Sequence, residues 1–227
     1  MGRNLNIISK PSPNFGKRKK NKKPSIIVIH YTAMKTATEA LALLCDPKSE
    51  VSCHYLIDER GQIFSLVKEQ YRAWHAGEGS WKGCEDVNSS SIGIELCNSG
   101  KSPYSFLLMD ALLNLIKIIS DRWSIDKSNV IGHSDLAPSR KKDPGRHFDW
   151  RTLELYGLAT KVQIHDASED FWNNLEKIGY YVINNGSYRN DLLEAFRSRY
   201  CPEHFGELNP RDRMIASGIV KNLNFSG

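Results

Sequence analysis

The stretch Ser25–Thr32 constrains the fold of this chain more than any other part of the sequence. Four consecutive branched apolar residues, Ile26–Ile29, follow Pro24 and lead directly into His30. A continuous apolar run of this length is typical of a strand buried on both faces, in a sheet covered by helices. Because α/β proteins usually place their chemistry where such strands end, His30 is a candidate site residue. A core histidine bonded to a backbone carbonyl remains the alternative.

Other patterns predict a mixed β-sheet flanked by helices. Strand-like runs on either side of a turn at Asp58–Gly61 predict a hairpin over residues 51–67. A capping-box pattern begins a short helix within residues 36–44, and residues 104–123 show the spacing of a long amphipathic helix. The predicted fold class is therefore α/β, with a central mixed sheet and helices on its faces.

The chain divides into three predicted regions. Six basic residues lie within Lys17–Lys23, and removing them from the formal charge of +5 leaves −1 for the remainder. We therefore expect residues 1–23 to form a basic, solvated N-terminal arm, and its lack of interleaved aromatic residues argues against nucleic acid as a partner. Residues 24–158 form the predicted main domain. Three short helix-spaced segments predict a small helical domain at residues 166–224.

The sequence also bears on the compartment and the oligomeric state. No run approaches the eighteen or so apolar residues that a membrane span requires. Because Met1–Ile8 lacks the apolar core of a secretory signal, we expect the protein to stay in the cytoplasm. We also expect it to be a monomer. The periplasm, or secretion without a classical signal peptide, remains the alternative. The five cysteines are an odd number without a C-x-x-C pair, which predicts free thiols rather than a disulfide framework.

The polar loop Gly132–Gly145 is a candidate metal site. His133 opens it after a short apolar run, and Asp143 lies near its end, directly before a proline and a glycine. Imidazole nitrogen and carboxylate oxygen both bind zinc, so these two side chains are candidate ligands. The alternative is a loop whose polar groups cap helices, because no zinc signature such as H-E-x-x-H is present.

Glu95 lies within the apolar run Ile92–Cys97. A carboxylate among buried apolar residues is costly unless it is paired or protonated, and its pKa tends to rise. A carboxylate with a raised pKa is suited to act as a general base near neutral pH. The alternative is that Glu95 points outward from an edge strand.

Aromatic residues gather in and beside a loop rich in glycine, serine and asparagine. Trp74, His75 and Trp81 are predicted to line one wall of a ligand groove. Loops carry binding groups more often than cores do. The alternative is that these rings only cover a sheet edge.

Five short motifs occur in the order found in the zinc N-acetylmuramoyl-L-alanine amidases. They are Ile29–Ala33, Ser52–Asp58, Ala73–Gly77, Ser91–Glu95 and Gly132–Gly145. The chain thus resembles the amidase-2 family, which includes AmpD-type and AmiD-type enzymes and the peptidoglycan recognition proteins. The match spans roughly residues 24–158. The C-terminal helices resemble, more loosely, the peptidoglycan-binding-like module of AmiD-type members.

The resemblance implies a zinc hydrolase and assigns roles to individual residues. Glu95 matches the catalytic glutamate, and Lys141 matches the catalytic lysine, although the adjacent Lys142 leaves open which of the two faces the site. The implied zinc ligands are His30, His133 and Asp143. The implied substrate-binding residues are His54, Trp74, His75 and Trp81.

The resemblance also implies the reaction. The substrate would be peptidoglycan or its muropeptide fragments, cut between N-acetylmuramic acid, or its 1,6-anhydro form, and L-alanine. AmpD-type enzymes recycle anhydromuropeptides in the cytoplasm, whereas AmiD-type enzymes act on intact wall in the periplasm, and both remain open. A peptidoglycan-binding protein without turnover is the alternative function.

Overall fold

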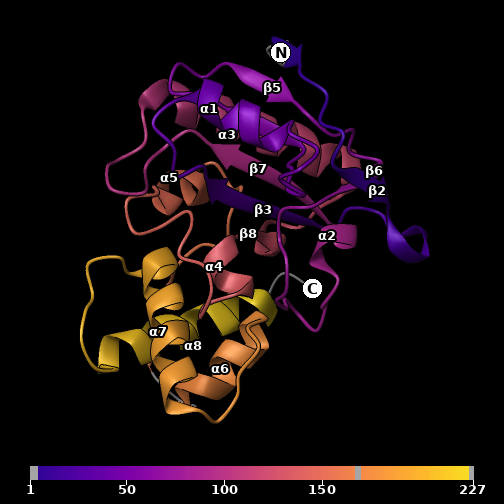
Figure 1. Cartoon of the computed structure of the whole chain (residues 1–227). Helices are drawn as coiled ribbons and strands as arrows, with labels where there is room; N and C mark the ends of the chain where they lie inside the picture. Colours follow the sequence, from indigo (N-terminus) through magenta and orange to yellow (C-terminus); the bar gives the residue numbers. More distant parts are fainter. Residues whose placement is uncertain (1–4, 167–169, 225–227) are drawn as a thin grey trace.

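A six-stranded sheet forms the centre of the protein, in the strand order β1-β5-β4-β7-β3-β8 (Figure 1). This computed structural model describes residues 5–166 and 170–224. The β4–β5 pair is antiparallel and the other neighbouring strands are parallel, which confirms the predicted mixed sheet and its hairpin. The strands are β1 (Ile7–Ser9), β3 (Ile26–Tyr31), β4 (Tyr55–Ile57), β5 (Ile63–Ser65), β7 (Ser91–Leu96) and β8 (Val130–Gly132).

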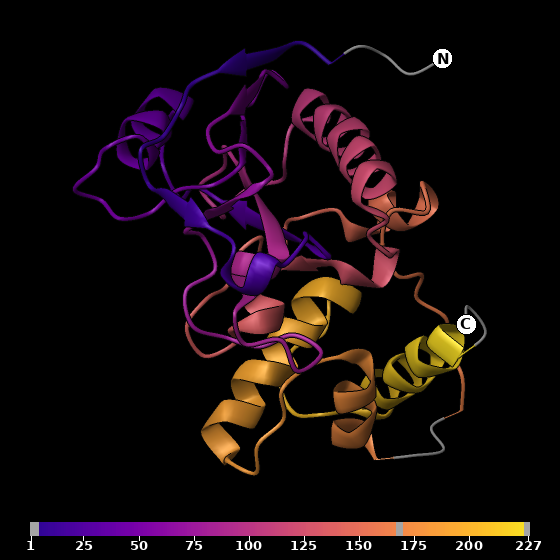
Figure 2. The same ribbon diagram turned by 90° about the vertical axis from the view of Figure 1, so that its right-hand side faces the viewer.

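Strand β3 is buried on both faces, as its sequence predicts. Ile27 and Ile29 face the long helix α3 (Phe106–Trp123), whereas Ile26 and Val28 face the C-terminal helices. Figure 2 shows α3 above and the C-terminal helices below, with the sheet between them. Complete burial of each such side chain contributes about 1.5–3 kcal/mol, so this strand alone is a large part of the core.

Helix boundaries follow local capping groups. The Thr36 Oγ1 atom accepts a hydrogen bond from the Glu39 amide at the start of α1 (Ala37–Leu44). Ser105 does the same for α3. The remaining short helices of the main region are α2 (Val87–Ser90), α4 (His133–Leu136) and α5 (Trp150–Leu155). In the described ranges, no helix combines the length and apolar character needed to cross a bilayer. All five cysteines are free, as predicted.

The described part of residues 1–23 is paired with the rest of the protein and is not a free arm, although most of its lysines are exposed. Strand β1 pairs with β5, and β2 (Phe15–Lys17) forms an antiparallel ribbon with β6 (Tyr71–Ala73). Arg18 is only 6% exposed, and its guanidinium donates hydrogen bonds to the backbone oxygens of Glu69, Ser89 and Ser91. Positive charge suggested solvation, but a guanidinium with five donors can be buried where enough carbonyls converge. Residues 1–4 of the predicted arm lie outside the described ranges.

The C-terminal region contains the three predicted helices, α6 (Phe171–Ile178), α7 (Gly186–Tyr200) and α8 (Pro210–Asn224). They share one hydrophobic cluster with a face of the sheet, in which Phe171 and Phe196 belong to the same core as Val28 and Ile131. The helices therefore do not form a satellite with a separate core. Residues 167–169 of the predicted region lie outside the described part.

A buried ion pair joins α7 to the loop that follows β8. The Arg199 Nη1 atom lies 2.7 Å from the Asp135 Oδ2 atom, and both side chains are almost fully buried. Asp135 also accepts hydrogen bonds from the Gly132 amide at 2.7 Å and from the Tyr180 hydroxyl at 2.6 Å. Arg199 additionally donates to the Val130 carbonyl. The C-terminal helices thus hold the backbone immediately before and after His133.

We predict that Arg199→Met lowers the free energy of unfolding by about 3–5 kcal/mol, because it leaves the Asp135 carboxylate buried without its partner. The matched control is Lys117→Met, which breaks an exposed pair with Asp121 and should cost about 0.5 kcal/mol or less. Urea unfolding of the three proteins measures the difference. Equal losses in the two variants would contradict a stabilising role for the buried pair.

Candidate metal and catalytic site

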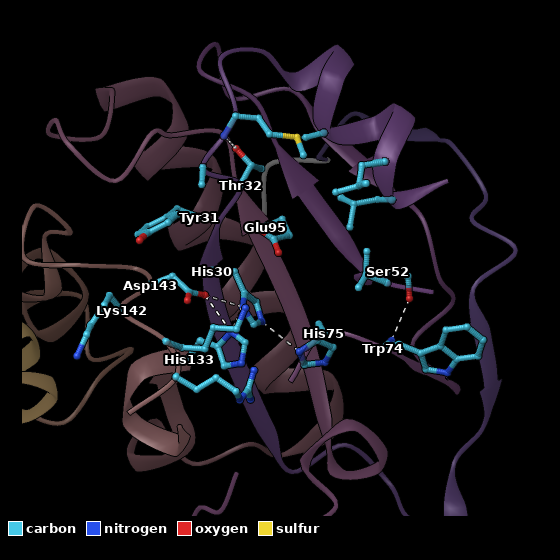
Figure 3. A pocket seen from close by; sticks show the side chains of 18 residues that line it. His30, Tyr31, Thr32, Ser52, Trp74, His75, Glu95, His133, Lys142 and Asp143 are labelled. Carbon is cyan, nitrogen blue, oxygen red and sulfur yellow. Dashed lines mark hydrogen bonds and ion pairs between the residues drawn. The ribbon is translucent and has the colours of Figure 1, made fainter. Parts of the chain in front are cut away.

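The site lies where three neighbouring strands end. His30 on β3 and Glu95 on β7 are direct cross-strand partners, so their side chains leave the sheet on the same face. Ile29 pairs with Gly132, which places His133 just beyond the end of β8. Because β3 lies between β7 and β8, three residues distant in sequence meet at the carboxyl ends of these strands (Figure 3). This is the edge at which open α/β sheets bind ligands.

Three potential ligand atoms converge at this edge. The His30 Nδ1 atom lies 2.9 Å from His133 Nδ1 and 2.9 Å from Asp143 Oδ2, and the third side of the triangle measures 3.1 Å. All three side chains are buried. Ligand atoms around tetrahedral zinc, with bonds of about 2.0–2.2 Å, are separated by about 3.3 Å. The triangle therefore needs only a small expansion to hold such an ion.

The protonation states also suit a cation. Burial and the nearby His133 lower the pKa of His30 to about 4, so its imidazole is neutral. A neutral imidazole and an ionised carboxylate are the forms that bind metals.

The backbone of the two loop ends is tightly packed. The Ser134 amide donates a hydrogen bond to the Asp143 carbonyl at 2.9 Å, which brings the two loop ligands together. A Cβ atom at Gly132 would lie 2.6 Å from the Pro144 Cδ atom, so only glycine fits at this position. The Asp143–Pro144 peptide bond is cis.

Glu95 is placed to act on a molecule in the cavity. Its Oε2 atom has no hydrogen-bond partner among the residues that the structure describes. Burial and the neighbouring Asp143 raise the pKa of Glu95 to about 8. Strand β7 lies between β4 and β3, so the alternative of an outward-facing residue on an edge strand is wrong.

The structure distinguishes the two adjacent lysines. Both lysines line the cavity, but it is the charge of Lys141 that lowers the pKa values of Glu95 and His30. Lys142 contacts Asp191 on α7 at 3.4 Å, its side chain is 60% exposed, and it points away from the histidines in Figure 3. Of the two, Lys141 is therefore the one whose charge acts on the groups of the site.

A cavity of about 400 Å³ opens over these groups. Trp74 and His75 line it, as predicted. Three residues of its wall, Tyr31, Met34 and Leu43, were not predicted from the sequence. Tyr31 and Leu43 lie in ordinary strand and helix patterns, and Met34 lies in the short loop between β3 and α1. Arg140 lies at the rim and donates a hydrogen bond to the Ala76 carbonyl at 2.7 Å.

Two predicted substrate-binding residues lie outside this cavity. His54 is completely buried: its Nδ1 atom accepts a hydrogen bond from the Gly93 amide, and its Nε2 group donates to the Tyr71 carbonyl. Trp81 is 1% exposed and packs edge-on against Tyr180. Both predictions of substrate contact are corrected: His54, directly before β4, is held inward by its backbone hydrogen bonds, and the ring of Trp81 folds inward from its glycine-rich loop.

A second group of potential ligands, formed by Cys201, His204 and Asp212, also occurs in the described ranges. Its chemistry differs from that of the first group. The Asp212 carboxylate is fully buried and already paired with Arg197 at 2.6 Å. A metal ion there would lie beside a buried guanidinium, and the two positive charges would repel each other. This group is therefore a hydrogen-bond network of the C-terminal helices.

Comparisons with known proteins agree with this geometry. Residues 20–146 match the family model described as Amidase_2, N-acetylmuramoyl-L-alanine amidase. AmiD of Escherichia coli K12 is 34% identical over 208 residues, which cover 83% of this chain and 70% of that protein. AmpD of Haemophilus influenzae is 34% identical over 157 residues, covering 61% of this chain and 85% of that protein.

Solved structures extend the similarity to the C-terminal helices. E. coli AmiD in complex with the substrate anhydro-N-acetylmuramic acid-L-Ala-D-γ-Glu-L-Lys aligns with a TM-score of 0.79 at 32% identity, covering 90% of this chain and 92% of that one. AmpDh3 of Pseudomonas aeruginosa aligns with a TM-score of 0.81 at 28% identity, covering 92% and 95%. The chain therefore belongs to the Amidase_2 family of N-acetylmuramoyl-L-alanine amidases.

Proposed function

We propose that this amidase is a zinc enzyme that hydrolyses the amide bond between N-acetylmuramic acid, or its 1,6-anhydro form, and the L-alanine of the stem peptide. The observation that carries the proposal is the triangle of three ligand atoms beside the unpartnered carboxylate oxygen of Glu95. The complex of the related AmiD with an anhydromuramyl peptide supports the substrate class.

His30, His133 and Asp143 are the proposed zinc ligands. Three protein ligands leave a tetrahedral ion one open position, which is typical of catalytic rather than structural zinc. When bound there, zinc would supply Lewis-acid activation of water and of the scissile carbonyl. No cysteine lies among these ligands, so oxidation of thiols would not remove a donor.

Glu95 and Lys141 are the proposed catalytic side chains. The Glu95 carboxylate would take a proton from the attacking water and deliver it to the amine of the departing L-alanine. The Lys141 ammonium would donate a hydrogen bond to the oxyanion that develops on the scissile carbonyl. Both groups face the same cavity, which a muramyl peptide would occupy between them.

We also propose that residues 24–158 form the catalytic domain and residues 166–224 a peptidoglycan-binding-like domain. A second cavity, of about 540 Å³, supports this division of labour. It is lined by Leu136 and Pro138 from the polar loop Gly132–Gly145 and by Tyr181 and Tyr188 from the C-terminal region. Arg140 lines both cavities, so a long substrate could extend from one to the other.

Metal removal tests the zinc proposal. We expect wild type to bind one equivalent of zinc, to lose activity in chelator and to regain it when zinc is added. Mass spectrometry of products from anhydro- and non-anhydromuropeptides should show release of the intact peptide beginning with L-alanine. Cleavage that persists in zinc-free protein would refute the mechanism, whereas substrate bound but uncut by zinc-loaded protein would favour a binding protein without turnover.

We predict that Glu95→Gln lowers kcat by about 100-fold or more, because a neutral amide cannot accept the proton.

The same substitution should stabilise the zinc-free fold at alkaline pH. Burial raises the pKa of Glu95 to about 8 from 4.5, so the folded protein prefers the neutral carboxyl. That stabilisation is complete below the unfolded pKa and is lost as pH rises through about 8.

Thermal unfolding of zinc-free wild type and Glu95→Gln between pH 4 and pH 9 measures this difference. The advantage of the glutamine variant should grow as pH rises and level off above about 8. A variant that is both inactive and less stable at every pH would show that Glu95 acts through folding.

The two lysines provide a matched pair. Lys141→Met should lower kcat by about 10²–10³-fold, because it removes a donor to the oxyanion. Lys142→Met should leave kcat within about threefold, since Lys142 is exposed and contacts the Pro138 carbonyl and Asp191. Steady-state kinetics of the two zinc-loaded variants decides between them. Equal losses would contradict the assignment of Lys141.

A further inference from the structure

We propose that the segment His75–Ala76, together with Ser91, forms an outer shell that fixes His30 and His133 in the tautomer with the proton on Nε2. Both Nδ1 lone pairs then face the metal position. His75 is thus a positioning residue rather than a substrate contact. The inference rests on the proposed zinc site.

The tautomer of His133 follows from one contact. Its Nε2 atom lies 2.8 Å from the Ala76 carbonyl oxygen, which can only accept a hydrogen bond. In the neutral form of the ring, which is the form that binds a metal, Nε2 therefore carries the proton. The Nδ1 atom, which lies 3.1 Å from Asp143, is left with a lone pair.

The tautomer of His30 follows from a chain of three hydrogen bonds. The Ser91 hydroxyl donates to the Val87 carbonyl at 2.6 Å, so its oxygen accepts from the His75 Nε2 group at 3.2 Å. The Nδ1 atom of neutral His75 then has a lone pair and accepts from the His30 Nε2 group at 3.1 Å. His30 Nδ1 is consequently left unprotonated, facing Asp143.

One side chain holds both outer-shell groups in place. The Asn88 Oδ1 atom accepts hydrogen bonds from the His75 amide at 3.0 Å and from the Ala76 amide at 2.9 Å. The side chain of the first residue orients His30, and the carbonyl of the second orients His133. A single two-residue segment therefore sets the direction of both imidazole ligands.

Strand β7 leaves room for the His75 ring. A Cβ atom at Gly93 would lie 2.4 Å from the His75 Cγ atom, a separation that side chains do not adopt. Both nitrogens of His75 are engaged within the protein, by His30 and Ser91. The ring therefore has no free donor or acceptor for a substrate, although it lines the cavity.

The test compares His75→Asn with His75→Leu. The asparagine oxygen can occupy the place of Nδ1 and accept from His30, whereas leucine has similar bulk and no acceptor. Zinc titration against a competing chelator should show affinity about 10–100-fold weaker for His75→Leu, the usual cost of losing an outer-shell partner. His75→Asn should bind zinc within a few-fold of wild type.

A second readout requires no metal. Two-bond ¹H–¹⁵N spectra of the histidine rings in zinc-free full-length protein report which nitrogen carries the proton. Wild type should show the Nε2–H form for both His30 and His133. His75→Leu should lose it at His30 only. Ser91→Ala, a smaller change, should shift His30 in the same direction and serves if His75→Leu does not fold.

The outcomes separate this proposal from the zinc proposal. Nδ1–H forms in zinc-free wild type, or equal zinc affinities for His75→Leu and His75→Asn, would overturn the outer-shell role while leaving the zinc site intact. A raised KM with unchanged zinc affinity would assign His75 to substrate binding instead. Wild type that shows the Nε2–H forms but binds no zinc would support the tautomer assignment and remove the proposed metal function.

Discussion

The convergence of two imidazole lone pairs and one carboxylate on a single point is the constraint on which this structure depends. Atoms of this kind repel one another at about 3 Å unless a cation or a proton lies between them. In a neutral His133 ring, the hydrogen bond from Nε2 to the Ala76 carbonyl leaves Nδ1, the atom that faces this point, without a proton. This arrangement is what supports the proposal of a metal ion at the site.

Strand pairing in the sheet brings these side chains together without the conformational entropy loss of ordering long loops. Parallel pairing of β3 with β7 and with β8 brings three strand ends to one edge, so His30 and Glu95 need no long loop to meet. The apolar run Ile26–Ile29 of β3 fixes the register by packing different residues on its two faces. A slip of one residue would turn His30 into the core under α3.

Residues outside the five motifs also hold the backbone around the three ligand atoms in place. Arg199 on α7 neutralises Asp135, which in turn holds the Gly132 amide next to His133. Arg18, near the N-terminus, bonds the carbonyl of Ser91, whose hydroxyl contacts His75. Arg18 and Arg199 therefore tie segments from both the N-terminal and the C-terminal regions to the backbone around the three ligand atoms. The charge of Arg199 is paired with Asp135, whereas that of Arg18 is surrounded by backbone carbonyls.

The sequence by itself determined the α/β class, the strand ending in His30, the three C-terminal helices and, through five ordered motifs, the grouping of His30, His133, Asp143 and Glu95. Local patterns and short motifs carry this information because strand burial and helix periodicity depend on neighbouring residues. Only the tertiary structure decided which way side chains point once distant segments meet. It turned His54 and Trp81 into the core, buried Arg18 among carbonyls, and separated Lys141 from Lys142. These outcomes depend on partners supplied by remote parts of the chain, which no local pattern records.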